Sequence, residues 1–126
     1  MVLGIIRSQV TIAAADWQQT LSFYQNLLQL PPQGLLPDRY AEFRLPDLTL
    51  ILYFPKPEER PELAVPHPSL SLCFYVESLE AAIAQLQAHG IPMTEPIQRS
   101  SHGQEIYLYD PNGNRIILYQ PNSSAT

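Results

Sequence analysis

The sequence Ile51-Leu52-Tyr53-Phe54-Pro55 returns near the C-terminal end of the chain as Ile117-Leu118-Tyr119-Gln120-Pro121. Each copy closes a segment with a similar order of strand and helix patterns, so the chain is an internal repeat. A unit of this size is too small to bury its own apolar face, and the two copies must therefore pack together. The groove between the packed repeats is a natural place for a ligand.

The first copy contains one helix and several strands. Asp16 is expected to cap the helix, with Gln19 three residues later as in a capping box. Its apolar stripe is expected at Trp17, Leu21, Tyr24 and Leu28, and Pro31 ends it. Alternation of apolar and polar residues, together with β-branched residues, predicts strands at 7–14, 40–45 and 48–54 and a short one near Leu35 and Leu36.

The second copy repeats this order after a proline-rich stretch at 56–68, which is expected to be a stiff linker. Ser78 is expected to cap its helix and Gly90 to end it in a left-handed conformation. Strands are predicted at 70–76, 97–99, 104–109 and 115–120. The order β-α-β-β-β thus occurs twice, which predicts a single α+β domain over 1–126, with module one at about 7–55 and module two at about 69–121.

Charge and composition exclude several classes of partner. The formal net charge is -5, and the 7 Lys and Arg are scattered, so we expect no nucleic-acid partner. The apolar runs are too short for a membrane span, and no leader pattern is present at the N-terminus. The single cysteine, Cys73, fits a reducing compartment. We therefore expect a cytoplasmic protein with no membrane contact.

A family resemblance rests on this layout and on two stretches of sequence. These are the runs at 20–28 (TLSFYQNLL) and 107–120 (YLYDPNGNRIILYQ). The chain resembles the vicinal oxygen chelate superfamily, which comprises glyoxalase I, extradiol dioxygenases, fosfomycin resistance enzymes and the bleomycin resistance proteins. The resemblance extends from about 8 to 121 and implies two βαβββ modules that form a cup-shaped mixed sheet. It also implies a homodimer, in which the modules pair within a chain or are exchanged between chains.

The resemblance also allows the metal positions to be examined. In metal-using members, the first and last strands of each unit supply the ligands, and these positions correspond to Gln9, Ile51, Ser71 and Ile117. Isoleucine has no lone pair to donate, and a serine hydroxyl is a poor ligand for a divalent transition metal. A shift of one residue at either isoleucine still offers no carboxylate. We therefore expect no metal and no cofactor.

The histidines and the Asp110–Asn114 turn offer no better metal site. His67, His89 and His102 lack a second donor at a spacing that would place both on one face. The turn has the composition of a hairpin, in which Asp110 bonds backbone amides ahead of it, and it lacks the further oxygen ligands of a calcium loop.

Period-two alternation predicts which side chains line the cup. The expected ligand-binding residues are Gln9, Thr11, Tyr53, Ser71, Cys73, Tyr75, Arg115 and Tyr119. Tyrosines can stack an organic guest, although they are also common on strands because their rings pack well there. Arg115 is either a partner for an anionic guest or a solvated surface charge. Cys73 lacks a basic partner and is expected to be an inert small side chain, with no catalytic residue elsewhere.

These expectations define two functions and leave a third open. The first is a metal-free protein of the bleomycin-resistance type that binds a small organic molecule between the repeats. The alternative is a metal-dependent enzyme of the glyoxalase or dioxygenase type with atypical ligands. The third is a structural or regulatory role, in which the cleft contacts another protein. Whether the chain is an enzyme stays open at this point, with the lost ligand positions favouring binding.

Overall fold

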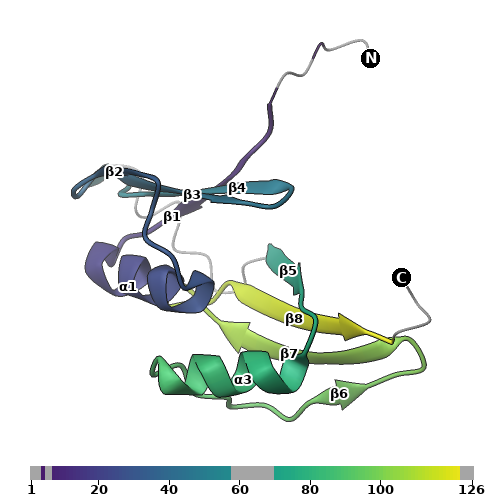
Figure 1. Ribbon diagram of the computed structural model, residues 1–126. Coiled ribbons are helices and arrows are strands. Elements are labelled where there is room, and N and C mark those ends of the chain that lie inside the picture. The colour runs from purple at the N-terminus through teal and green to yellow at the C-terminus, as the bar shows by residue number, and fades with distance from the viewer. Residues whose placement is uncertain (1–3, 5–6, 58–69, 123–126) are drawn as a thin grey trace.

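The computed structural model describes residue 4 and residues 7–57 and 70–122. Module one contains β1 (Val10–Ala13), α1 (Trp17–Leu28), β2 (Gly34–Leu36), β3 (Tyr40–Leu45) and β4 (Leu48–Tyr53) (Figure 1). Module two contains β5 (Ser71–Tyr75), α3 (Leu79–Ala88), β6 (Gln98–Arg99), β7 (Gly103–Tyr109) and β8 (Arg115–Pro121). The expected α+β fold with two βαβββ modules is confirmed. Most of the expected linker, including His67, lies outside the described residues.

Each module forms its own four-stranded mixed sheet. Sheet A has the strand order β1-β4-β3-β2, and sheet B has the order β5-β8-β7-β6. In both sheets the first strand pairs in parallel with the last, and the other pairings are antiparallel. The two strands that carry the repeated sequence, β4 and β8, therefore occupy the same interior place in their sheets.

Local signals position the two helices as expected. The Asp16 carboxylate accepts a hydrogen bond from the Gln19 amide at 3.3 Å, and the Ser78 hydroxyl accepts one from the Ala81 amide at 3.1 Å. Gly90 follows the end of α3 with a φ of 83°, a left-handed conformation that glycine adopts without strain. In the described part of the chain, neither helix is long and apolar enough to cross a membrane.

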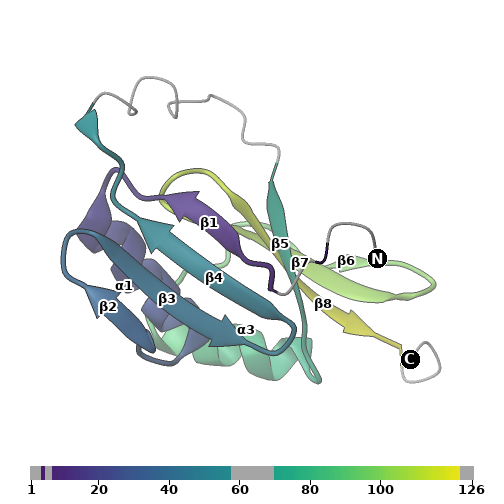
Figure 2. The same cartoon turned by 90° about the horizontal axis from the view of Figure 1, so that it is seen from above.

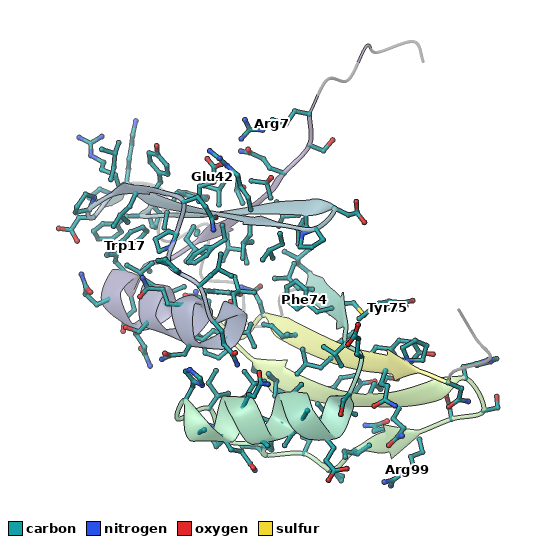
Figure 3. All side chains as sticks on the ribbon, viewed as in Figure 1. Arg7, Trp17, Glu42, Phe74, Tyr75 and Arg99 are labelled. Carbon is teal, nitrogen blue, oxygen red and sulfur yellow. The ribbon has the colours of Figure 1, made fainter. Side chains whose placement is uncertain are left out.

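The buried stripe of α1 differs from the expected one. Trp17 and Tyr24 are buried as expected, but Thr20 and Leu27 are the other buried residues of the helix, and Leu21 and Leu28 are half-buried. The reason is that α1 packs against two surfaces. Trp17 lies between α1 and sheet A (Figure 3), whereas Leu27 lines an apolar cavity together with residues of sheet B and α3.

The aliphatic sides of both sheets meet in one core. Buried residues of sheet A, sheet B, α1 and α3 form a single hydrophobic cluster. Seen from above, sheet A lies over both helices, and sheet B extends to one side of them (Figure 2). The helices thus cover the aliphatic side of each sheet. The opposite side of each sheet is turned away from the core, and we call these sides open face A and open face B.

A buried polar cluster joins the modules. The Tyr24 hydroxyl of α1 donates to the Asp110 carboxylate at 2.6 Å, and the Asn112 side chain donates to the Thr20 hydroxyl at 3.2 Å. Asp110 also accepts from the amides of Asn112 and Asn114, at 2.9 and 2.8 Å, which confirms the hairpin expected for this turn. Burial, followed by the Asp110 charge and hydrogen bond, raises the pKa of Tyr24 far above its usual value, so its hydroxyl remains a donor.

Candidate functional site

Open face A is defined by the register of sheet A. Thr11, Ile51, Glu42 and Gly34 form one row across the four strands, and Ala13, Tyr53, Tyr40 and Leu36 form the next. Figure 3 shows Glu42 and Arg7 on the side of sheet A away from α1. The expected ligand residues Thr11 and Tyr53 therefore lie on this face, with an isoleucine near its centre.

Charged groups on open face A are paired with one another. The Arg44 guanidinium donates to the Glu42 carboxylate at 2.5 Å. This hydrogen bond, with the charges of Arg44 and Arg7, lowers the pKa of Glu42 against a smaller desolvation effect. Arg7 also donates to the Gln9 side chain at 3.2 Å, so the Gln9 amide oxygen is engaged beside this face.

Open face B is defined in the same way by sheet B. Its three rows are Ser71, Arg115 and Tyr109; Cys73, Ile117 and Tyr107; and Tyr75, Tyr119, Glu105 and Gln98. Figure 3 shows Tyr75 on the side of β5 opposite to Phe74, which packs against the core. Five of the eight expected ligand residues thus share this face.

The side chains of open face B contact one another in two groups. The Arg115 guanidinium lies over the Tyr107 ring at 4.9 Å from its centroid, and its Nε donates to the Ser71 hydroxyl at 3.1 Å. At the other end, the rings of Tyr75 and Tyr119 meet edge to face, with centroids 5.1 Å apart. Tyr75 is 73% exposed, which leaves its ring available to a guest.

Cys73 lies between these two groups, on an edge strand and exposed to solvent. Desolvation and then the negative charge of Glu105 raise the pKa of its thiol. At neutral pH the protonated thiol therefore dominates, which is the opposite of what a nucleophile needs.

The structure brings the expected residues together in two sets. Ser71, Cys73, Tyr75, Arg115 and Tyr119 gather on open face B, whereas Thr11 and Tyr53 lie on open face A with Gln9 beside it. Since both faces point away from the shared core, one chain does not place the two sets opposite each other.

Sequence reasoning missed two carboxylates on these faces. Glu42 is in register with Ile51, and Glu105 is in register with Tyr119. The alternation of strands 40–45 and 104–109 contained the signal, but using it required the pairing register, which fixes the face that each alternate residue occupies.

The donor set of the two faces does not fit a divalent metal. Ile51 and Ile117 hold the central positions, and the described residues contain no group of three or more His, Cys, Asp or Glu side chains that could hold an ion. Nδ1 of His89 lies 2.8 Å from the Gln85 carbonyl oxygen at the end of α3, and His102 is exposed in the loop before β7.

With this geometry in hand, comparison with known proteins gives the class. A family model described as the Glyoxalase/Bleomycin resistance protein/Dioxygenase superfamily matches residues 7–118, and the chain belongs to this family. The resemblance noted in the sequence is thereby confirmed. An Escherichia coli relative, the uncharacterized protein YaeR, is 27% identical over 120 residues, which cover 88% of this chain and 92% of YaeR.

Solved structures show the same fold. A glyoxalase/bleomycin resistance protein from Catenulispora acidiphila is similar with a TM-score of 0.72 and 18% identity, covering 94% of this chain and 100% of that one. A lactoylglutathione lyase from Agrobacterium tumefaciens has a TM-score of 0.67 and 20% identity, covering 93% and 95%. The fosfomycin resistance protein FosX from Listeria monocytogenes has a TM-score of 0.70 and 17% identity, covering 94% and 95%.

Proposed function

We propose that this protein is a metal-free member of its family that binds a small organic molecule against its open faces. The observation that carries the proposal is the chemistry at the centre of each face. Ile51 and Ile117 stand among tyrosines and a few hydrogen-bonding groups, which suits an organic guest better than an ion. A cytoplasmic location belongs to the same proposal, supported by the single cysteine and the acidic composition.

The proposal includes a second copy of the chain. A cleft lined by both repeats requires open face A of one copy to stand opposite open face B of another, because the two faces of one chain diverge. β1 and β5 are the edge strands at which such sheets can meet. We therefore propose a homodimer whose ligand sites each combine one module from either chain.

Mass spectrometry of the protein under non-denaturing conditions tests the binding function. A bound organic molecule should be retained by the native protein and lost from the Tyr53→Ala and Tyr75→Ala variants. Tyr53 lies on open face A and Tyr75 on open face B. Leu35→Ala, which shortens an exposed side chain on the other side of sheet A, serves as the control. A molecule retained equally by all the variants would contradict a site on these faces.

Light scattering on the same samples should give the mass of a dimer, and a monomer at all concentrations would contradict the shared site.

A metal-dependent enzyme of the glyoxalase or dioxygenase type is the second candidate. It is favoured by the two carboxylates on the open faces, Glu42 and Glu105, which lie in register with positions near the expected metal site. Turnover of the methylglyoxal–glutathione adduct that is abolished by a chelator and restored by a divalent metal would support this candidate over metal-free binding. The Glu42→Gln variant should then lose that turnover.

A further inference from the structure

Open face B carries a cation at one end and an anion at the other. Arg115 is the first residue of β8, and Glu105 is in register with Tyr119 further along the same strand. Tyr119 lies four positions after Arg115 in the sequence, which corresponds to about 13 Å along a strand. The two charges are therefore too far apart to pair with each other.

Among the described residues, no carboxylate forms an ion pair with the Arg115 guanidinium. Stacking on Tyr107 and the hydrogen bond from Nε to Ser71 fix its orientation, and within the described part of the chain neither terminal nitrogen has a hydrogen-bond partner. The ion pair found within residues 7–57 and 70–122 lies on the other sheet, between Arg44 and Glu42. A guanidinium oriented in this way is suited to bind a carboxylate through two parallel hydrogen bonds.

The opposite end of the face suits an ammonium group. Glu105 supplies a half-buried carboxylate, and the adjacent rings of Tyr119 and Tyr75 present π-electrons beside it. An ammonium group at this end would be attracted both by the carboxylate and by the ring faces. The stretch between the two ends is formed by Cys73 and Ile117, which are uncharged and accommodate a neutral chain.

We propose that open face B selects an elongated zwitterion, with its carboxylate on Arg115 and its ammonium group at Glu105. This inference rests on the proposed binding function and names the chemical class of the ligand. A molecule with a single charge would satisfy one end and leave the other hydrated, so length and both charges together determine selection.

A series of ω-amino acids measures this spacing directly. The probes are 4-aminobutanoate, 8-aminooctanoate and 11-aminoundecanoate, with octanoate and octylamine as single-charge compounds, titrated into the full-length protein by NMR. The longer amino acids should bind about tenfold tighter than 4-aminobutanoate and than either single-charge compound. Their shift changes should centre on Cys73, Tyr75 and Arg115.

Matched variants assign each end. Arg115→Gln should remove the preference for 8-aminooctanoate over octylamine, and Glu105→Gln should remove its preference over octanoate. Arg99→Gln, on the other side of sheet B, makes the same change of charge and should alter neither preference. Arg115→Lys, which keeps the charge but loses the planar fork, should bind with intermediate affinity.

The outcomes separate this inference from the proposed function. Equal binding of octanoate and 8-aminooctanoate to this face, unchanged in Glu105→Gln, would overturn the zwitterion while leaving a binding site. Retention of another molecule on the tyrosines, with no binding of any probe, would likewise overturn the zwitterion and leave a binding site. Failure of every probe, with no molecule retained by the native protein, would overturn both proposals.

Discussion

At the scale of single residues, environment matters more than residue type. Cys73 is exposed on an edge strand, yet desolvation and the charge of Glu105 both disfavour its thiolate. Tyrosine is often exposed on helices, but Tyr24 is buried against Asp110 and joins the two modules. The apolar stripe predicted the burial of Tyr24, but its bond to Asp110 and the effect of Glu105 on Cys73 cannot be read from the local sequence, because each depends on a partner from a distant segment.

The raised pKa of Cys73 predicts slow alkylation in spite of its exposure. Its thiolate forms only as the pH rises above the ordinary thiol range, so the rate of reaction with iodoacetamide should keep increasing beyond that range. Glu105→Gln removes one of the two causes and should move the pH profile to lower values. A profile at the ordinary thiol pKa that is unchanged by Glu105→Gln would contradict this account of Cys73.

The buried hydrogen bond of Tyr24 predicts a loss of stability when it is removed. Tyr24→Phe keeps the ring but deprives Asp110 of one donor, and should lower the free energy of unfolding by about 1–2 kcal/mol. Urea denaturation measures this change. Tyr75→Phe alters the same group on a 73% exposed residue and should change stability by less than about 0.5 kcal/mol. Equal effects of the two substitutions would show that the bond between the modules contributes nothing.

At the scale of secondary-structure elements, the sequence predicted well where the signal was local. The caps at Asp16 and Ser78 and the interior strands β3, β4 and β8 agree with the predicted patterns, since capping and alternation depend on neighbouring residues. The buried side of α1 was partly wrong because the helix packs on both modules, which the sequence does not show. Glu42 and Glu105 were missed because their faces depend on strand register.

The pairing of β7 with β8 makes a prediction at Gly103. A side-chain carbon on Gly103 would clash with the backbone carbonyl of Gln120, which cannot move without breaking the pairing. Gly103→Ala should therefore lower the free energy of unfolding by about 1–3 kcal/mol, as judged by thermal and urea denaturation. At Gly34 an added carbon would meet Glu42 at 3.5 Å, an ordinary contact, so Gly34→Ala is the matched control. A Gly103→Ala protein as stable as Gly34→Ala would contradict the register of this strand pair.

At the scale of the whole molecule, the repeat in the sequence becomes a repeat of sheets. β4 and β8 occupy equivalent positions, and each places an isoleucine near the centre of an open face. The sequence predicted this equivalence and the family. It could not show that the aliphatic sides of both sheets converge on one core, with the open faces turned apart. That arrangement is why the proposed ligand site needs two chains.

The open faces, as far as the described residues form them, lack a donor set for a metal, and equilibrium uptake of metal tests this central claim most directly. The purified protein is dialysed separately against zinc, nickel, manganese and iron(II), and the metal retained per chain is measured by elemental analysis. We predict far less than one equivalent of any of them, with no difference between the native protein and the Glu42→Gln variant. Tight retention of one equivalent that is lost in Glu42→Gln would contradict the central claim.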